Sequence, residues 1–194
     1  MHHSFSSEPF SKDKFEYVLV NVLKMSGHTA SLAPKGNPGH DASSDGVKLS
    51  LKTQADKGVK ENIIWISKFM ELGKGTWGDN PDDLVGLRKQ FLEHMKAYDR
   101  ILILRTLAKT PKWKYELVEI PKSLLLKAKD GELQMMADSK QYPKPGYCHV
   151  QNKAGETIFD LYFDGGTERK LQIKNLNKSV CSVHATWEFI IPPE

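Results

Sequence analysis

The segment from residue 47 to residue 53 constrains the fold most, because apolar and polar residues alternate along it. Neighbouring side chains of a β-strand point to opposite faces of a sheet, so this alternation predicts a strand with one apolar and one polar face. The apolar set is Val47, Leu49 and Leu51, and the polar set is Lys48, Ser50 and Lys52. Such a strand requires a sheet and an apolar layer to cover one face.

Helices and strands are predicted on both sides of this strand. Ser11 is a good N-cap, and the apolar residues that follow recur at helical spacing until Gly27, which predicts a helix over residues 12–26. The further predicted elements are a strand at 29–33, a buried helix at 61–72, a helix from Asn80 to about 98, strands at 101–107 and 113–120, and a short helix at 121–128.

The character of the sequence changes after about residue 131. Four strand-like runs follow, at residues 146–152, 157–163, 170–176 and 182–191. The order of elements predicts an α/β fold with a β-rich C-terminal annex. We therefore divide the chain into a loose N-terminus (1–10), a core (11–130) and an annex (131–194).

Composition bounds the class of protein. Apolar residues make up 39% and charged residues 27% of 194 residues, which is enough apolar material for a core and excludes wholesale disorder. The net charge of +4 is compatible with a nucleic-acid partner. No segment approaches the roughly 20 apolar residues of a membrane span, and the N-terminus does not resemble a signal peptide, so we expect a cytoplasmic protein without membrane contact. With only Cys148 and Cys181, a disulfide scaffold is excluded.

Asp41 and Lys52 are the residue types that a metal-dependent nuclease needs. A carboxylate ahead of a hairpin can bind Mg²⁺ through oxygen, and the carbonyl of Leu51 is expected at the same level. Ser50 and Lys52 point to the same side of the predicted strand, because they are two residues apart. The lysine ammonium can lie beside the attacking water and the scissile phosphate, where it stabilises developing charge.

This pattern resembles the PD-(D/E)XK nuclease superfamily, which contains many type II restriction endonucleases. The core of that superfamily is a helix, a three-stranded meander, a second helix and two further strands, and residues 12 to about 120 follow this order. His40-Asp41 would correspond to the proline–aspartate element, and Ser50-Leu51-Lys52 to the acidic–x–lysine element. The resemblance implies a restriction-endonuclease-like core, with a mixed central β-sheet flanked by helices.

The resemblance also implies a second carboxylate, because Ser50 cannot serve as an anionic ligand. Glu61, at the start of the next predicted helix, is the natural substitute, and Glu16 resembles the extra carboxylate that several superfamily members carry on the first helix. In this scheme Asp41, Glu61 and Glu16 bind Mg²⁺, and Lys52 assists the water and the charge.

Each of these residues also has a plain structural explanation. Asp41 follows a Pro-Gly turn, and turn chemistry alone can account for an aspartate there. Lys52 and Glu16 could be solvated surface charges, and Glu61 could complement a helix dipole. Asp45 fits a turn better than a metal site, although it remains an alternative ligand.

A second group of polar residues lies in the annex and suits a surface that recognises DNA. Arg, Asn and Gln can read base edges, whereas lysine mostly contacts phosphate. The candidates are Arg169, Lys170, Gln172, Lys174, Asn175, Asn177 and Lys178, together with Gln54 on the polar face of the 47–53 strand. A solvated hairpin is the alternative explanation for the annex residues.

The sequence thus predicts a Mg²⁺-dependent type II restriction endonuclease that hydrolyses duplex DNA at a short specific site. The resemblance implies in-line attack that leaves a 5′-phosphate, and a homodimer whose symmetry matches that of a palindromic site. Three alternatives stay open: a structure-specific resolvase or repair nuclease, a non-catalytic DNA-binding protein, and a protein-interaction module.

Overall fold

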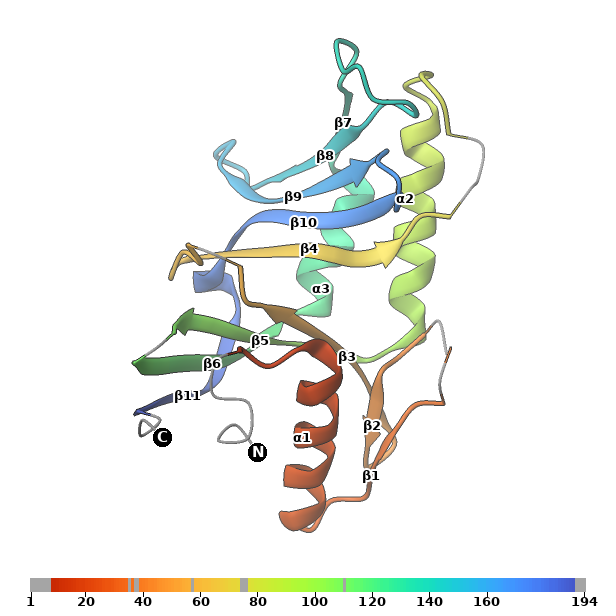
Figure 1. Ribbon diagram of the computed structural model, residues 1–194. Coiled ribbons are helices and arrows are strands. Elements are labelled where there is room, and N and C mark those ends of the chain that lie inside the picture. Colours follow the sequence, from red (N-terminus) through yellow and green to blue (C-terminus); the bar gives the residue numbers. More distant parts are fainter. Residues whose placement is uncertain are drawn as a thin grey trace. The chain divides into compact units, whose positions relative to one another are not determined.

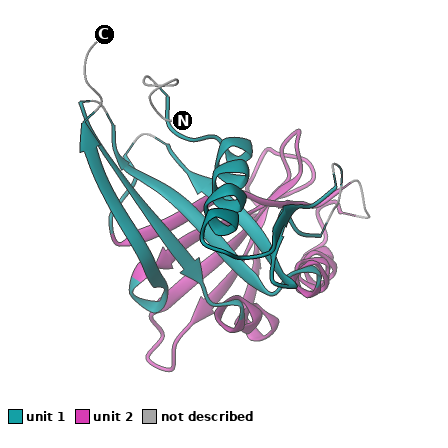
Figure 2. Cartoon of the chain, turned by 90° about the horizontal axis from the view of Figure 1, so that it is seen from below, with its two compact units in different colours: residues 1–61, 97–122, 179–194 teal, residues 62–96, 123–178 magenta. Residues whose placement is uncertain are grey.

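The computed structural model describes residues 8–34, 36, 39–56, 58–73, 77–109 and 111–190 (Figure 1). Most of the predicted loose N-terminus, residues 1–7, lies outside these ranges. The chain forms two compact units that interleave along the sequence (Figure 2). Unit 1 contains residues 1–61, 97–122 and 179–194, and unit 2 contains residues 62–96 and 123–178.

Unit 1 is built on a mixed six-stranded sheet. Its strand order is β1 (Ala30–Leu32), β2 (Ala42–Ser44), β3 (Val47–Gln54), β5 (Arg100–Ala108), β6 (Lys112–Ile120) and β11 (Ser182–Ile190). Strands β3 and β5 are parallel, and every other neighbouring pair is antiparallel. The predicted mixed central sheet of an α/β fold is therefore confirmed.

Helix α1 (Lys12–Met25) packs against this sheet and confirms the predicted first helix. The Ser11 side chain accepts a hydrogen bond from the Lys14 amide, so it caps the helix start. Gly27, with φ of 87°, follows the helix end, where a left-handed conformation favours glycine. Phe15 of α1 belongs to the same core cluster as Leu49 and Leu51 of β3.

The predicted strand is also confirmed as β3, but its burial does not alternate, because its polar face is more buried than we expected. Ser50, Lys52 and Gln54 are only 2%, 8% and 4% exposed. Strand β3 is interior to the sheet, between β2 and β5, and interior strands of sheets with a parallel pair are commonly covered on both faces. Three polar side chains are thus held in a buried row on one face of the sheet.

Unit 2 contains an antiparallel sheet of five strands. Its order is β4 (Ile63–Glu71), β10 (Lys170–Asn177), β9 (Thr157–Asp164), β8 (Gly146–Gln151) and β7 (Glu132–Met135). Helix α2 (Asp83–His94) contacts β7 and β8, and continues into the short 3₁₀ helix η2 (Met95–Ala97). Among the described residues, the further short helices are α3 (Lys122–Leu125), η3 (Leu126–Asp130) and η4 (Lys178–Val180).

The prediction of a helix over residues 61–72 is wrong, because this segment forms strand β4. Ile64 and Ile66 are buried whereas Trp65 between them is 38% exposed, which is the period of a strand. The segment is rich in β-branched and aromatic residues, and it pairs with β10. Glu61 therefore precedes a strand instead of starting a helix, and the next helix begins only at Asp83.

The four strands predicted in the annex are present as β8, β9, β10 and β11. Strand β11, however, pairs with β6 and belongs to the sheet of unit 1. The functional division into a nuclease core (11–130) and a recognition annex (131–194) stays a prediction. None of the helices that the structure describes is long and apolar enough to cross a membrane, and the cytoplasmic location also stays a prediction.

Candidate active site

Asp41 is held against β3 by its backbone and by its carboxylate. Its amide donates a hydrogen bond to the carbonyl oxygen of Leu49, and its Oδ2 accepts one from the Leu51 amide at 2.6 Å. Its Oδ1 accepts a hydrogen bond from Lys12 Nζ at 2.7 Å. The carboxylate therefore faces the middle of β3 and the start of α1, which turn chemistry alone does not explain.

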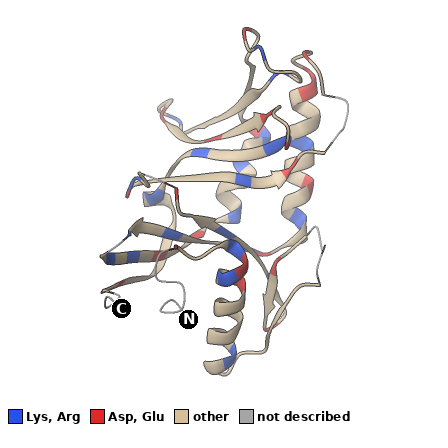
Figure 3. Ribbon diagram, viewed as in Figure 1, with Lys and Arg blue, Asp and Glu red and all other residues tan. Residues whose placement is uncertain are grey.

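Lys12 joins two carboxylates at the N-terminal end of α1, where acidic and basic residues lie together (Figure 3). Its ammonium is 2.7 Å from Asp41 Oδ1 and 3.3 Å from Glu16 Oε1. The Glu16 side chain is only 19% exposed, and it lies one helical turn beyond Lys12 on α1. The structure thus brings Asp41 and Glu16 to a single cation.

Lys52 lies in the electrostatic field of this cluster. Its charge is attracted by Asp41 and Glu16 and repelled by Lys12, and burial lowers the pKa of its ammonium to about 8. The cluster of Lys12, Glu16, Asp41 and Lys52 carries two positive and two negative charges. A lysine with a depressed pKa beside paired carboxylates is typical of a catalytic site.

The two carboxylates respond differently to their surroundings. Burial opposes ionisation of Asp41, but Lys52, Lys12 and the Leu51 amide outweigh it, so the pKa of Asp41 is lowered. Burial and the nearby charge of Asp41 raise the pKa of Glu16, despite its ion pair with Lys12. Asp41 is therefore the more firmly ionised of the two.

Glu61 is not brought to this cluster. Its carboxylate pairs with Lys114 Nζ at 3.6 Å, and Lys114 lies opposite Ala108 on β5. Ala108 is five residues beyond Ile103, the β5 partner of Lys52, which corresponds to about 16 Å along the strand. Glu61 is placed toward the far end of the β3–β5 pair, so its predicted role as a metal ligand lacks a geometric basis.

Asp45, the alternative ligand, is a turn residue. It occupies the turn between β2 and β3 with φ of 49°. Its Oδ1 accepts a hydrogen bond from the Thr29 amide at 2.9 Å, and its Oδ2 lies 2.7 Å from His28 Nδ1. Both carboxylate oxygens therefore bind neighbours of β1.

The predicted recognition residues on β10 contact other residues of unit 2. Gln172 accepts a hydrogen bond from Trp65 Nε1 at 3.1 Å and donates one to Asp164 Oδ2 at 2.9 Å. Asn175 donates to Asp160 Oδ2 at 2.7 Å. The amides that we expected to read bases are thus engaged in bonds within the sheet.

The charged candidates nearby differ in their contacts. Lys174 Nζ lies 3.7 Å from the centre of the Tyr162 ring, and Lys170 Nζ is 3.2 Å from Glu168 Oε2. Arg169 has φ of 41° at the turn before β10. Asn177 ends β10, and Lys178 begins η4, where its amide donates to the carbonyl of Asn62. A DNA contact by any of them stays a prediction.

The residues that sequence analysis missed are Lys12, Arg105 and Glu116. Lys12 and Glu16 are four residues apart on a predicted helix, which was the available signal for Lys12. Arg105 is fully buried on β5, and it pairs with Glu116 of β6 and binds the Gln54 side chain. In the sequence Arg105 follows an apolar run and Glu116 lies in a segment of mixed apolar and charged residues, and nothing there indicated that they meet.

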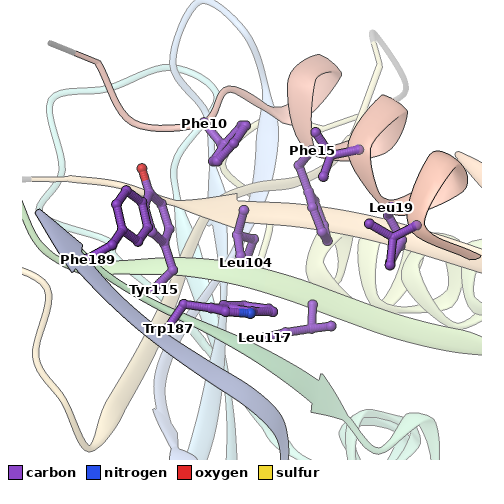
Figure 4. A pocket seen from close by; sticks show the side chains of 10 residues that line it. Phe10, Phe15, Leu19, Leu104, Tyr115, Leu117, Trp187 and Phe189 are labelled. Atoms are coloured by element: carbon purple, nitrogen blue, oxygen red, sulfur yellow. The ribbon is translucent and has the colours of Figure 1, made fainter. Parts of the chain in front are cut away.

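Unit 1 also contains an apolar cavity of about 280 Å³ between α1 and the sheet (Figure 4). Its lining carries no charged side chain and is formed by Phe10, Phe15, Val18, Leu19, Val22, Leu104, Tyr115, Leu117, Trp187 and Phe189. Without ionisable groups other than the phenol of Tyr115, this cavity is not suited to phosphodiester chemistry. The polar cluster at the start of α1 is therefore the candidate active site.

The chemistry of this cluster fits Mg²⁺. Among the described residues, no group of three or more His, Cys, Asp or Glu side chains is placed to share a metal ion. Mg²⁺ is, however, commonly bound by one or two carboxylates, with waters and substrate phosphates completing its shell. Asp41 and Glu16 supply two carboxylates that already converge on one ammonium, so the residues present fit this ion.

The α/β fold with its mixed sheet agrees with the class of restriction-endonuclease-like nucleases. Comparison with known proteins supports this class. The family model of SmaI, described as type II site-specific deoxyribonuclease, matches residues 1–189. The chain is 48% identical to the type II restriction enzyme SmaI of Serratia marcescens over 194 residues, which is 99% of this chain and 76% of that relative.

The chain therefore belongs to the SmaI family of type II site-specific deoxyribonucleases. Its activity is that of a restriction endonuclease, and its substrate is DNA. This confirms the predicted enzyme class and decides against the resolvase, the non-catalytic DNA-binding protein and the protein-interaction module.

Proposed function

We propose that this restriction endonuclease cleaves DNA at a Mg²⁺-dependent centre of the PD-(D/E)XK type, in which Asp41 and Glu16 hold the ion. The observation that carries the proposal is the position of Lys12 Nζ, at 2.7 Å from Asp41 and 3.3 Å from Glu16. The ammonium marks a place where a cation is stabilised by both carboxylates. Bound by this pair, Mg²⁺ would supply positive charge for the phosphate oxygens and a more acidic water.

Lys52 has two tasks in this proposal. Its ammonium stabilises the negative charge that develops on the phosphate oxygens as the phosphorus is attacked. Because burial lowers the pKa of its Nζ to about 8, the same group can release and take up a proton near neutral pH more readily than an ordinary lysine. Its buried position on β3 fixes the ammonium relative to Asp41.

The variant motif Ser50-Leu51-Lys52 is explained by Glu16. Ser50 occupies the strand position of the missing acid, and its hydroxyl cannot replace an anionic ligand. Glu16 approaches Asp41 from α1 instead, so the second carboxylate comes from a helix that precedes the motif in the chain. We therefore propose Glu16, and not Glu61 as expected from the sequence, as the source of the second carboxylate.

We further propose that the enzyme acts as a homodimer on a short palindromic site in duplex DNA. Two-fold symmetry of a dimer matches the symmetry of such a site, so each copy would cleave one strand. Two basic residues of unit 2, Lys170 at the start of β10 and Lys178 at the start of η4, are candidates for phosphate contacts.

Cleavage of plasmid DNA tests the proposal. Wild-type enzyme with Mg²⁺ is expected to give discrete fragments, and EDTA should abolish them. Asp41→Asn, Glu16→Gln and Lys52→Met should each reduce cleavage strongly, whereas the matched carboxylate control Glu61→Gln should cleave like wild type. Loss of cleavage in Glu61→Gln, together with normal cleavage in Glu16→Gln, would contradict the assignment of the second ligand.

A further inference from the structure

Arg105 is the most completely enclosed charged side chain of unit 1, with no exposed surface. Its guanidinium donates to Gln54 Oε1 at 2.9 Å, to the carbonyl of Glu61 at 3.1 Å, to the carbonyl of Lys60 and to the Glu116 carboxylate. These bonds connect β5 to the end of β3, to the segment that follows β3, and to β6. Arg105 is thus placed to fix the geometry of the strand that carries Lys52.

The bond from Arg105 determines which way the Gln54 amide points. A guanidinium has donors only, so it must bind the amide oxygen of Gln54 and not the nitrogen. The Gln54 amide nitrogen is consequently directed away from Arg105. Gln54 is 4% exposed, and within the ranges that the structure describes no partner is found for this nitrogen.

Ser50, on the same face of β3, is a second buried polar side chain of this kind. Ser50 is 2% exposed, and in the described part of the chain its hydroxyl has no hydrogen-bond partner. Buried polar groups are nearly always satisfied, so each exception calls for an explanation such as a ligand or a solvent molecule. Ser50, Lys52 and Gln54 form a row of donors spaced about 7 Å apart along one strand face.

We propose that the Arg105–Glu116 ion pair positions Gln54 so that its amide donates a hydrogen bond to a backbone phosphate of the bound DNA. This inference rests on the proposed function, because it takes Lys52 to lie at the scissile phosphate. Gln54 is one strand repeat beyond Lys52 on the same face, so the phosphate it binds is a neighbour of the one that is cleaved. Arg105 is a positioning residue that acts through Gln54 and does not touch the DNA.

The position of Lys52 and Gln54 on one face of β3 favours a contact from Gln54 to a phosphate over a contact to a base edge. Lys52 and Gln54 share one strand and one face, so both donors meet the same stretch of the DNA backbone. A glutamine that reads adenine uses its amide oxygen and nitrogen together, but here the oxygen is already bound by Arg105. Only the nitrogen is available, which suits a single phosphate oxygen.

Binding to modified DNA tests the contact. Affinity is measured for the full chain carrying Asp41→Asn, on duplexes of the cognate site in which one phosphate at a time is a neutral methylphosphonate. With Gln54 present, one phosphate next to the scissile one should lose about 10-fold in affinity when neutralised. In the Gln54→Met variant, affinity for unmodified DNA should fall by a similar factor, and the sensitivity at that phosphate should vanish.

Two results would overturn the contact. Gln54→Met could keep the wild-type sensitivity at every phosphate, or it could alter the preference for one base pair instead. The assay is run with EDTA as well as in the Asp41→Asn background, so the DNA stays uncleaved and the result does not depend on the metal ligands being assigned correctly. An error in the proposed metal site would appear in the cleavage assay and leave the binding pattern unchanged.

The positioning role is tested by removing both partners of the ion pair. In Arg105→Met/Glu116→Met no unpaired charge is left buried, and such replacements are often tolerated. The loss should fall on the same single phosphate, and adding Gln54→Met should cause no further loss. Arg105→Lys, which keeps the charge without the fork of donors, is expected to give the same loss if the double variant does not fold.

A matched control lies on the same strand. Arg100 of β5 pairs with Glu119 and not with a side chain of β3, so Arg100→Met should leave the phosphate pattern as in wild type. A merely structural role of Arg105 would lower thermal stability and spread any loss over all phosphates, or add fully to that of Gln54→Met. Either of these results would contradict the proposal.

Discussion

The two sheets of this protein differ in how completely the polar groups of their buried side chains are hydrogen-bonded. In the sheet of unit 2, the buried Gln172 and Asp160 are both hydrogen-bonded to other side chains of the same sheet. In the sheet of unit 1, the buried Ser50 and the Gln54 amide nitrogen have no partner in the described part of the chain. Satisfied polar groups stabilise a fold, whereas unsatisfied ones are kept where a ligand completes them.

The lysines of the two sheets also differ in their surroundings. Lys174 of unit 2 rests against the Tyr162 ring at 3.7 Å, and burial lowers its pKa in spite of Asp164 and Asp160. Lys52 of unit 1 is more deeply buried and lies near Asp41. Sequence alone presents both as lysines on the polar face of a strand, so the proposal of Lys52 as the catalytic lysine rests on its surroundings.

The largest expected effect is on Lys52. Lys52→Met should reduce single-turnover cleavage by about 1,000-fold, because a preorganised positive charge at the phosphate is lost. The fold should be retained, since methionine fills the same buried space without a charge to desolvate. Lys174→Met provides the matched comparison in unit 2 and should change cleavage less than 10-fold. Equal losses of cleavage in Lys52→Met and Lys174→Met would contradict the assignment of the catalytic lysine to the sheet of unit 1.

The next effect concerns Lys12, which occupies the cation position between Asp41 and Glu16. Lys12→Gln should lower the Mg²⁺ concentration for half-maximal cleavage by roughly 3- to 10-fold, because the ion no longer competes with an ammonium. The measurement is a Mg²⁺ titration of the initial cleavage rate. A higher Mg²⁺ requirement in the variant would show that Lys12 supports the ion instead of standing in its place.

A smaller effect tests the satisfied network of unit 2. Gln172→Leu removes the bonds to Trp65 and Asp164 and should reduce the free energy of unfolding by about 1–2 kcal/mol. Cleavage at the cognate site should remain normal below the unfolding temperature. Denaturant unfolding and a digest of DNA with altered sites measure the two quantities. Relaxed site specificity would restore the interpretation of Gln172 as a base contact.

The smallest effect is on acid stability. Hydrogen bonds from Arg100 and His184 lower the pKa of Glu119 from 4.5 to about 2, although burial opposes them. Because the pKa is lower in the folded state, this stabilisation is present above pH 4.5 and is lost as the pH falls toward 2. The free energy of unfolding of Glu119→Gln should therefore be about 1 kcal/mol lower than that of wild type at neutral pH. As the pH is lowered, the free energy of unfolding of the variant should fall less than that of wild type. A parallel decline in both proteins would contradict this.

Much of unit 1 could be predicted because its signals are local. The caps of α1, the alternation in β3 and the apolar runs of β5 and β6 each lie within one segment. Asp41 could be placed beside the middle of β3 from the sequence, because a hairpin connects β2 to β3 and its register pairs Ala42, the next residue, with Leu49.

The remaining features depend on contacts between distant segments. Residues 63–71 are apolar on most sides, and periodicity cannot tell a buried strand from a buried helix until the pairing with β10 is known. Because that segment is a strand, Glu61 does not lie at the start of a helix, which was the reason for predicting it as a metal ligand. The Arg105–Glu116 pair likewise depends on the register of β5 and β6, in which the two residues lie opposite each other.

The central claim is that Asp41 and Glu16 share one divalent ion. Isothermal titration calorimetry with Ca²⁺, in the presence of cognate DNA, measures this ion without cleavage complicating the signal. We predict that wild type and Glu61→Gln bind the ion alike, whereas Asp41→Asn and Glu16→Gln each weaken binding by at least about 10-fold. Unchanged binding in Glu16→Gln would contradict the account.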